Sequence, residues 1–413
     1  MIQSVLFVHH GQNWIRGSER AMLDLAAALP AHGWQSSIVC TADAVVDEAR
    51  ALGVPAERIA PWTRTGVLPG PADVAIWRAR LRRLQPDVVH VNDSHFLPPV
   101  LASAMRAHLP LVVHQHILDD AFSRLYSLMH QASAIVTISA EAEAAVAGDG
   151  YPRERLHRIP NGVPLRESRD AVDIRELVRA APGESVAVSV GSLIPRKGHD
   201  RTLNALRHAL DLGATIQLAV VGSGDEEEAL RELARALGVE ARVHFLGERG
   251  DVQDLLRNAD LFISASREEV QPLSVIEAML CGLPVIASAI QAHVEMVDGD
   301  GGMIVEASDA AAFGVAIAGM SARRSDLHAA RSRFSARAQE RYSFTRYVER
   351  FAGLYQSLVQ TPRREFGFLR GLRHVPAYTE WVASAVRRRV GGARERGPSL
   401  ESALELPRSL ARD

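Results

Sequence analysis

Short, mostly apolar segments alternate with longer amphipathic segments along most of the chain, and this alternation restricts the fold more than any other feature. In the first half, the short segments cover residues 5–8, 36–40, 88–91, 111–113, 134–138 and 156–159. Apolar residues at consecutive positions are typical of parallel strands that helices cover on both faces. Helical patterns lie between them, for example at 19–29 and 72–84. This βαβα order predicts a doubly wound α/β domain.

The same pattern starts again after an interruption. Residues 160–183 hold three prolines and two glycines, and we interpret them as a linker. Predicted strands follow at 186–190, 216–221, 243–246, 261–264 and 284–287, with helices at 200–212, 226–237 and 273–281. The sequence therefore predicts two Rossmann-like domains, 1–165 and 166–341, that face each other across a cleft. Because open parallel sheets bind ligands beyond the carboxyl ends of their strands, we expect the site there.

Composition excludes several classes of protein. The 413 residues carry a formal net charge of −2, whereas general nucleic-acid-binding proteins are usually basic, so we expect no nucleic-acid partner. Two cysteines, Cys40 and Cys281, are too few for a disulfide framework. The apolar run at 5–8 is too short for a signal peptide, and no stretch approaches the ~18 uncharged apolar residues of a membrane span. We expect a cytoplasmic protein.

The C-terminal segment, residues 361–413, has a different composition. It holds 11 arginines and 6 acidic residues, a net charge of +5. The stretches FGFLRGLRHV and WVASAVRRRVGG mix aromatic residues with arginines. One interpretation is a helix on an anionic membrane surface, which would make the protein peripheral on the inner face of the membrane. The other is a solvated tail, or a helix that packs on the body of the protein.

A first candidate site follows the predicted strand 186–190, in the sequence GSLIPRKGHD at 191–200. Gly191 allows a tight turn at the strand end. Arg196 and Lys197 then lie just before a predicted helix. Two cations beside a helix N-terminus are well suited to bind a diphosphate. The alternative is a pair of solvated basic residues in a loop.

A second candidate site follows the predicted strand 261–264. Glu269 and Glu277 are separated by seven residues, and Pro272 with Ser274 marks the start of the helix that holds Glu277. Both carboxylates can face one cleft, where each can accept two hydrogen bonds from vicinal hydroxyl groups. Alternatively, Glu269 is a surface charge and Glu277 is favoured by the helix dipole.

These motifs, in this order, resemble those of a known family. GSLIPRKGHD, VVGSGDEEEAL, VHFLGE, ADLFISAS and the pair Glu269–x7–Glu277 followed by AMLCGLPVIAS resemble the retaining glycosyltransferases of family 4, also called group 1. The segments RGSERAMLDLAAALPAHGW and RIPNGVP resemble that family's glycine-rich loop and interdomain segment. The resemblance spans about residues 1–360 and implies the GT-B fold.

The resemblance implies roles for individual residues. Arg196 and Lys197 would hold the diphosphate of a nucleotide-sugar donor and stabilise the leaving nucleoside diphosphate. Glu277 would bind the ribose hydroxyls, and Glu269 the hydroxyls of the transferred sugar. Gly17 would let the first domain's loop approach the donor. The other donor-binding residues implied are Gly191, Gly222, Gly224, Phe245, Leu246, Gly247, Leu273 and Ser274.

His116, in PLVVHQH, matches the family's histidine near the transferred sugar. His114 is an alternative, and a buried or capping histidine is another interpretation of either position. The two could also be read as a metal pair, but no carboxylate or cysteine partner is identifiable nearby. Asp298-Gly299-Asp300 fits a turn between a helix and a strand better than a metal-binding motif. We therefore assign no metal and no cofactor.

Two positions depart from the family pattern. Glu269 is followed by Val270, Gln271 and Pro272, where the family often has Gly-Phe-Gly. This leaves the identity of the sugar open. The family's double glycine is Arg16-Gly17 here, and Arg16 either occupies the cleft or points to solvent.

The resemblance implies a hexosyltransferase-type enzyme that retains anomeric configuration and needs no metal. It would move a sugar to a glycan or lipid-linked acceptor in bacterial surface polysaccharide or lipopolysaccharide biosynthesis. Residues 342–360 would form a helix that crosses back to the first domain. The alternatives are a nucleotide-sugar epimerase of the same fold and a non-catalytic homologue that binds nucleotide sugars. Donor base, sugar, acceptor, linkage and oligomeric state are not readable from the sequence.

Overall fold

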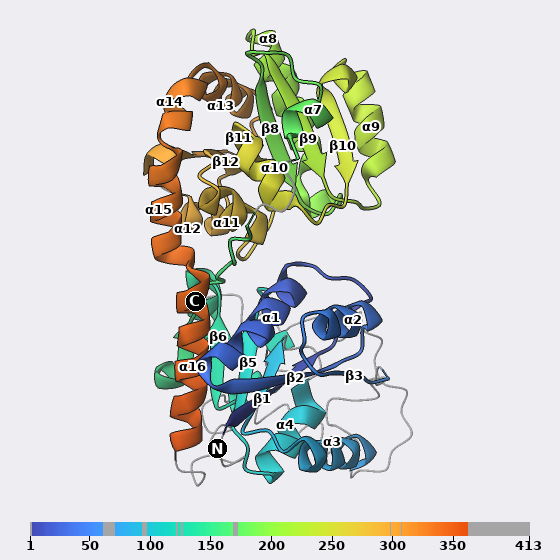
Figure 1. Ribbon diagram of the computed structural model, residues 1–413, viewed down its shortest axis with the longest axis vertical. Helices are drawn as coiled ribbons and strands as arrows, with labels where there is room; N and C mark the ends of the chain where they lie inside the picture. Colours follow the sequence, from blue (N-terminus) through green and yellow to red (C-terminus); the bar gives the residue numbers. More distant parts are fainter. Residues whose placement is uncertain are drawn as a thin grey trace, which may run out of the picture. The chain divides into compact units, whose positions relative to one another are not determined.

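The computed structural model describes residues 2–60, 71–92, 97–120, 123–124, 127–167, 172–297, 299–306 and 308–361. Its architecture is two parallel β-sheets with helices around each (Figure 1). We refer to the first sheet with its helices as the first lobe, and to the second as the second lobe. The basic segment 361–413 lies, apart from Thr361, outside the described residues, so the two interpretations of it stay open.

The first sheet has seven strands in the order β3-β2-β1-β4-β5-β6-β7. All its pairings are parallel. The strands are β1 (Gln3–His9), β2 (Trp34–Cys40), β3 (Ala56–Arg58), β4 (Val88–Asn92), β5 (Leu111–Gln115), β6 (Ala134–Thr137) and β7 (Leu156–Arg158). Six of them coincide with the predicted segments. The edge strand β3 was not predicted, because its three residues, Ala-Glu-Arg, form no apolar run.

The second sheet has six strands in the order β10-β9-β8-β11-β12-β13, again all parallel. The strands are β8 (Ser185–Val190), β9 (Ile216–Val221), β10 (Val243–Gly247), β11 (Leu261–Ser264), β12 (Val285–Ser288) and β13 (Gly302–Val305). Successive residues of β8 pack into two separate cores: Ala187 belongs to one, and Val186 and Val188 belong to the other. Both faces of the sheet are therefore buried, as the continuous apolar runs predict.

The helices connect these strands. Those of the first lobe are α1 (Gly17–Ala28), α2 (Asp43–Ala51), α3 (Pro71–Leu84), α4 (Leu97–Arg106) and α6 (Ala140–Gly148). They are followed by α7 (Ile174–Leu177), α8 (His199–Asp211), α9 (Glu227–Ala236), α10 (Val252–Asn258), α11 (Leu273–Leu280), α12 (Gln291–Met296), α13 (Ala310–Ala322), α14 (Arg324–Ala329), α15 (Arg331–Tyr342) and α16 (Phe344–Gln360). Polar side chains cap several of them. Ser139 accepts a hydrogen bond from Ala142 N at the start of α6, and Asp309 accepts one from Ala312 N at the start of α13.

Each sheet order reverses direction once, between β1 and β4 in the first sheet and between β8 and β11 in the second. This is the topology of a doubly wound sheet, and the prediction of two such domains is confirmed. Ligands of open α/β sheets bind beyond the carboxyl ends of the strands at the point of reversal. The loops that follow β1, β8 and β11, with the end of β4, therefore position the site.

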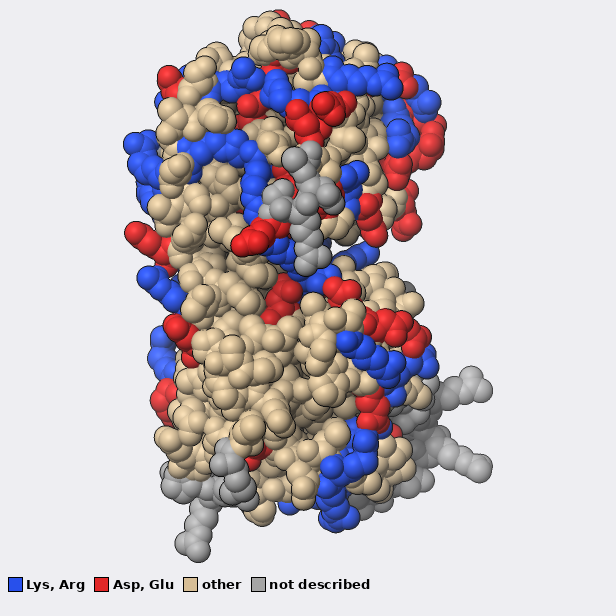
Figure 2. All heavy atoms as spheres, viewed as in Figure 1, with Lys and Arg blue, Asp and Glu red and all other residues tan. Residues whose placement is uncertain are grey.

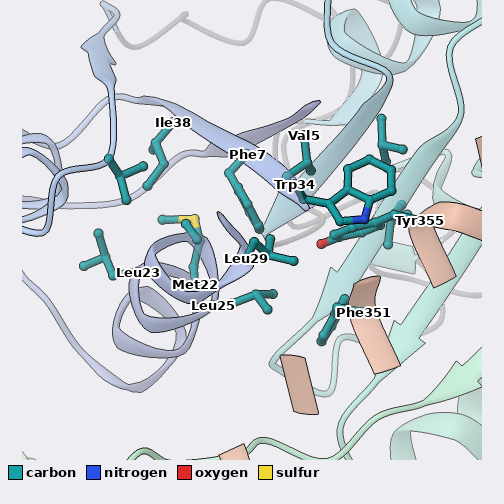
Figure 3. Close-up of a cluster of buried hydrophobic side chains, with 14 of the residues drawn as sticks. Val5, Phe7, Met22, Leu23, Leu25, Leu29, Trp34, Ile38, Phe351 and Tyr355 are labelled. Atoms are coloured by element: carbon teal, nitrogen blue, oxygen red, sulfur yellow. The ribbon is translucent and has the colours of Figure 1, made fainter. Parts of the chain in front are cut away.

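Helix α16 packs against the first sheet although it follows the second lobe in sequence. Its Tyr347, Phe351 and Tyr355 are buried in the same core as Phe7 and Trp34. Phe351 and Tyr355 are labelled with Phe7 and Trp34 in Figure 3. The rings of Tyr355 and Trp34 are 5.4 Å apart, centroid to centroid, in an edge-on arrangement. The chain thus returns to its first lobe through a 17-residue helix.

Two further findings concern partners of the whole chain. Among the described helices, none is both long and apolar enough to cross a lipid bilayer. On the face drawn in Figure 2, basic and acidic side chains are interspersed.

Two histidines are buried where α16 meets the first sheet. His90 Nδ1 lies 2.6 Å from the Tyr355 hydroxyl, and the His114 ring lies 5.0 Å from that of Phe351. Burial, with the charge of the nearby His116, lowers the pKa of His90 to about 3 and holds that of His114 well below its usual value. Both rings are therefore neutral in the folded protein at physiological pH.

Acid should destabilise the first lobe through these histidines. Because their pKa is lower in the folded than in the unfolded state, their contribution is complete above about pH 6.5 and is lost as pH falls below it. Between pH 7.5 and 5.5 the loss is on the order of 1 kcal/mol for each histidine. We expect His114→Leu to reduce the difference in unfolding free energy between these pH values by that amount.

Urea unfolding followed by tryptophan fluorescence in a Trp381→Phe background measures this difference, because the other four tryptophans all lie within residues 14–77. The control is His32→Gln, since His32 is exposed and should leave the pH dependence unchanged. A His114→Leu protein with the wild-type pH dependence would show that His114 does not remain neutral in the fold.

Candidate functional site

The loop after β8 forms a short helical turn that presents two cations. Residues Pro195–Lys197 make one 3₁₀ turn, and Gly198 joins it to the start of α8 at His199. A Cβ atom on Gly191 would lie 3.3 Å from Lys197 Cδ, so the lysine stem runs across the glycine. Arg267 N donates to Arg196 O over 2.8 Å, which ties this loop to the one that follows β11. The two loops meet because parallel strands end at the same edge of the sheet.

Glu269 is the centre of this arrangement. Lys197 Nζ lies 2.5 Å from Glu269 Oε1, and Arg196 Nη1 lies 3.0 Å from Glu269 Oε2. Ser266 Oγ also donates to Oε1, over 3.1 Å. The Glu269 side chain is 6% exposed, whereas that of Arg196 is 44% exposed. The structure thus brings together three of the predicted residues in one ion cluster that a ligand can reach through Arg196.

The charges of the cluster control its protonation. Burial by itself raises the pKa of Glu269, but Lys197 and Arg196 outweigh it and hold this pKa below its usual value. Glu269 is therefore an anion, and its one negative charge is paired with the two positive charges of Arg196 and Lys197. The remaining positive charge is available to an anionic ligand such as a diphosphate.

Arg267 and Asp200 support the cluster from outside. Arg267 donates two hydrogen bonds to the Asp200 carboxylate, of 2.8 and 2.6 Å, and a third to Pro195 O, of 2.6 Å. A bidentate arginine–carboxylate pair fixes both direction and distance. The sequence did not single out Arg267, because it is one of several charged residues in a polar loop.

Glu277 lies in the second turn of α11, apart from this ion cluster. Gln253 Nε2 is 3.4 Å from Glu277 Oε1, and the same amide binds the linker through Pro164 O (3.0 Å) and Arg166 N (2.9 Å). Burial raises the pKa of Glu277 above its usual value, while the Gln253 hydrogen bond opposes this effect. The structure therefore places Glu277 beside the linker, which the sequence did not predict.

Three predicted glycines lie where β8, β9 and β10 end. Gly222 N donates to Gly247 O over 2.8 Å. Gly222 has a φ of +136°, and a Cβ atom there would lie 2.0 Å from Gly191 O. A Cβ atom on Gly224 would lie 2.4 Å from Leu193 O. Close contact between backbones requires glycine at both positions, and the same loops surround the predicted nucleotide pocket.

Phe245 and Leu246 point to opposite faces of the second sheet. Phe245 packs against the core beneath α8 and α9, and its ring is covered by the Arg231 guanidinium, 4.5 Å from the centroid. Leu246 packs against the other core. Both side chains are thus partly buried against a hydrophobic core, and their role at the nucleotide base stays a prediction.

The start of α1 faces the start of α11. A Cβ atom on Gly17 would lie 3.6 Å from Leu273 Cγ, so a side chain at Gly17 would be in ordinary van der Waals contact with Leu273. Ser274 is the next residue of α11. The structure therefore brings Gly17, Leu273 and Ser274 together, at the N-terminal ends of two helices that belong to different lobes.

His116 belongs to a buried polar network in the first lobe. His116 Nε2 lies 2.9 Å from Asn92 Oδ1, at the end of β4. Asn92 O in turn lies 2.9 Å from His9 Nδ1, and His9 Nε2 lies 3.1 Å from Glu19 Oε1. Burial alone would raise the pKa of Glu19, but His9 and the backbone at Arg16 lower it to about 2. Glu19 is therefore ionised and faces His9 as an anion.

Sequence reasoning missed Asn92, His9 and Glu19. All three are polar residues that end or follow a strand of the switch point, in VHVND, FVHH and RGSER, and this is the signal that could have found them. His114, the predicted alternative to His116, is buried with its ring 3.9 Å from the His116 ring. Among the described residues, no group of three or more His, Cys, Asp or Glu side chains is placed to hold a metal ion.

The two departures from the family pattern each make a specific contact. Arg16 is exposed, and its guanidinium carbon lies 3.9 Å from the centroid of the Trp14 ring, so it stacks on an aromatic face. Gln271 is buried, and its Oε1 accepts a hydrogen bond from Asn161 N over 2.7 Å. Gln271 thus binds the interdomain segment. Asp298 lies outside the described residues, while Gly299–Gly301 form a short 3₁₀ turn before β13.

Comparison with known families gives two adjoining matches. The model described as "Glycosyltransferase Family 4" matches residues 15–167, and the model described as "Glycosyl transferases group 1" matches residues 173–341. Between them they cover most of both lobes, from just before α1 to Arg341 in α15. Both models describe glycosyltransferases, and neither describes an epimerase.

Individual proteins agree with these models. The chain is 34% identical over 144 residues to the lipopolysaccharide glucosyltransferase WaaG of Escherichia coli, which covers 33% of the chain and 38% of WaaG. It is 26% identical over 269 residues to a GDP-mannose-dependent alpha-(1-6)-phosphatidylinositol dimannoside mannosyltransferase of Mycobacterium tuberculosis, covering 61% and 68%. The match to WaaG thus spans about two fifths of that protein.

A solved structure shows the same fold. The Anabaena protein HepE, crystallised with UDP and glucose, superimposes with a TM-score of 0.75 at 22% identity, covering 86% of this chain and all of that chain. At this identity the likeness concerns the fold, and it supports the predicted GT-B architecture.

The close contact at Gly222 generates a stability prediction. Gly222→Ala would place Cβ 2.0 Å from a backbone oxygen, so we expect a loss of more than about 3 kcal/mol. Gly213→Ala is the matched control, because Gly213 also has positive φ but no atom within 4 Å of its Cβ position. It should cost about 1 kcal/mol. Urea unfolding followed by far-UV circular dichroism compares them, and equal losses would contradict the clash.

Proposed function

The chain belongs to the group 1 glycosyltransferases of family 4, and on this basis we propose that it transfers a sugar from a nucleotide-diphosphate-sugar donor to a glycan or lipid-linked acceptor. One observation supports binding of such a donor. Arg196, Lys197 and Glu269 form one ion cluster at the carboxyl edge of the second sheet, beside the N-terminus of α8. This is where a doubly wound sheet binds phosphate groups.

The donor site follows from the charges of these residues. The diphosphate binds to Arg196 and Lys197, whose charges stabilise the negative charge that develops as the sugar–phosphate bond breaks. Glu269 lies within contact of both cations and accepts hydrogen bonds from hydroxyl groups of the transferred sugar. Glu277 has Gln253 as a neighbour and accepts hydrogen bonds from the ribose.

We propose that the reaction retains the configuration of the anomeric carbon. The bond between this carbon and the diphosphate oxygen breaks, and a bond to the acceptor oxygen forms on the same face of the sugar. The acceptor's proton passes to the leaving diphosphate. Glu269 is paired with two cations, which makes it a weak nucleophile, so this front-face route is favoured over a covalent intermediate. Because Arg196 and Lys197 supply the positive charge, the proposed reaction needs no divalent metal.

The relatives support an acceptor of the bacterial surface. One is a lipopolysaccharide glucosyltransferase and another a phosphatidylinositol dimannoside mannosyltransferase. A structural relative was crystallised with UDP and glucose, which supports a nucleotide-sugar donor. We therefore propose a role in surface polysaccharide or lipopolysaccharide biosynthesis on the cytoplasmic side of the membrane.

Donor binding is the direct test. A panel of nucleoside diphosphates and nucleotide sugars, in EDTA, should contain one nucleotide family that stabilises the protein by about 2.7 kcal/mol at 100 times its dissociation constant. Lys197→Ala should weaken this binding by about tenfold or more. Thermal shift of the unfolding transition measures both effects.

Arg207→Ala is the matched control, because Arg207 is a cation of α8 that pairs with Asp211 in the same helix. It should retain wild-type binding. Equal binding by wild type and Lys197→Ala would contradict the proposed diphosphate site, and absence of binding by every donor would favour the non-catalytic alternative.

The basic segment 361–413 supports a separate proposal, that the protein associates with anionic membranes. Its net charge of +5 and its interleaved aromatic residues are suited to an anionic lipid surface. Removal of 361–413 should reduce binding to phosphatidylglycerol vesicles in a sedimentation assay and leave donor binding unchanged. Unchanged vesicle binding would contradict the membrane role.

A further inference from the structure

A buried polar network adjoins the ion cluster of the second lobe. Ser264 ends β11, and Ser266 lies in the loop that leads from this strand to Glu269. Ser288 ends β12, and His293 belongs to α12. Ser288 and His293 are 0% exposed, and Ser266 is 2% exposed. The proposed mechanism assigns no role to His293 or the three serines, although the Ser266 hydroxyl donates to the Glu269 carboxylate.

The hydrogen bonds of Ser288 determine the protonation of His293 Nδ1. The Ser288 hydroxyl donates its single proton to Ser266 O, 2.6 Å away, because a backbone carbonyl can only accept. Ser288 Oγ is therefore an acceptor toward His293 Nδ1, which lies 3.0 Å away. Ser288 O is a second acceptor at the same distance from Nδ1. His293 Nδ1 must then carry a proton.

The other ring nitrogen faces a hydroxyl donor. His293 Nε2 lies 3.2 Å from Ser264 Oγ. Burial lowers the pKa of His293 below its usual value, although the Ser288 carbonyl and the Glu269 charge oppose this effect. The charge of Lys197 acts in the same direction as burial. The ring is therefore neutral, and Nε2 carries the lone pair that accepts the Ser264 proton.

We propose that His293 is a positioning residue that fixes the loop after β11 and, through Ser266, the direction of the Glu269 carboxylate. His293 Nδ1 orients the Ser288 hydroxyl toward Ser266 O and so holds the Ser266 backbone. Ser266 Oγ has three acceptors around it, and the Glu269 carboxylate, at 3.1 Å, is the nearest. The inference rests on the proposed function only where Glu269 binds the transferred sugar.

The residues on either side of Ser266 contact the turn that presents the two cations. A Cβ atom on Gly198 would lie 2.1 Å from Ala265 O, so the two backbones are in direct contact. Arg267 N donates to Arg196 O over 2.8 Å. The loop is thus fixed at two points to the turn before α8, and the hydrogen bond to Ser266 O fixes it at a third.

The direction of the carboxylate decides which of its oxygens a sugar can reach. Glu269 Oε1 accepts from Lys197 Nζ and Ser266 Oγ, and these two donors occupy its two lone pairs. Glu269 Oε2 faces Arg196, whose side chain is 44% exposed. A hydroxyl group of the sugar therefore binds at Oε2. If Ser266 moves, the carboxylate loses this orientation, while both cations of the diphosphate site remain.

The protonation of the ring can be tested without any substrate. Protein labelled with ¹⁵N-histidine is examined at pH 7.5 by long-range ¹H–¹⁵N correlation, with His293 assigned from the variant His293→Gln. We expect a protonated Nδ1 and an unprotonated Nε2. An Nε2–H tautomer, or a ring that is protonated at both nitrogens, would overturn the assignment. The measurement uses the wild-type protein, so it does not depend on the folding of a variant.

Two amide variants test the positioning role. The amide nitrogen of asparagine reaches the place of Nδ1 and that of glutamine the place of Nε2, so His293→Asn retains a donor to Ser288 and His293→Gln loses it. Calorimetry at a temperature where each variant is folded compares a nucleotide sugar with its nucleoside diphosphate. The pairs are UDP-glucose with UDP and GDP-mannose with GDP, the nucleotides of two relatives.

We expect His293→Gln to weaken binding of the nucleotide sugar about tenfold relative to its nucleoside diphosphate. The diphosphate contacts Arg196 and Lys197, whereas Glu269 contacts only the sugar. His293→Asn should recover most of the wild-type ratio of the two dissociation constants. The control His328→Gln, at an exposed position of α14, should keep that ratio. A wild-type ratio in His293→Gln, or equal weakening of both ligands, would refute the positioning role.

Ser266→Ala tests whether the effect passes through Ser266. It should change the ratio as much as His293→Gln does, and the double variant should change it no further, since both remove one hydrogen bond to Glu269. Additive effects would overturn the route through Ser266. If the wild type binds none of the four nucleotides, the proposed function fails instead, whereas the NMR measurement still decides the ring assignment.

Discussion

All strands of each sheet run in the same direction, and the rest of the structure depends on this constraint. Parallel pairing brings the carboxyl ends of β8 and β11 to one edge, although about 70 residues of chain lie between them. The loops that follow these strands therefore meet, and Arg196 and Lys197 come within hydrogen-bonding distance of Glu269. In the first lobe the same constraint brings together the loop after β1 and the end of β4, and so His9 and Asn92.

Buried charges are paired differently in the two lobes. In the second lobe one carboxylate is shared by two cations, and an excess of positive charge remains next to a helix N-terminus. In the first lobe Glu19 faces His9, and the pair leads through Asn92 to His116. A diphosphate requires net positive charge, whereas a sugar requires oriented donors and acceptors. In the proposed function, Arg196 and Lys197 therefore suit the diphosphate, whereas Glu269 and the first-lobe network suit the sugar.

The sequence predicted the architecture well, because short continuous apolar runs between amphipathic helices are typical of strands in a covered parallel sheet. It did not predict β3, whose residues Ala56 to Arg58 carry no apolar pattern. It singled out Arg196 with Lys197 and, separately, Glu269 with Glu277, but it did not predict that Glu269 pairs with the two cations while Glu277 lies beside Gln253. It could not predict that Gln253 and Gln271 bind the linker, or that Arg16 stacks on Trp14. These contacts depend on which side chains fold together, and a single polar residue in a loop carries no such information.

The most direct test of the central claim is the configuration of the sugar that the enzyme releases from its donor. Proton NMR can follow the anomeric signal during turnover of the nucleotide sugar in EDTA, with water as acceptor and at times shorter than mutarotation. The account predicts that the first sugar to appear has the donor's anomeric configuration, and that Arg196 and Lys197 suffice without metal. Initial appearance of the opposite anomer, or turnover that begins only after Mg²⁺ is added, would contradict it.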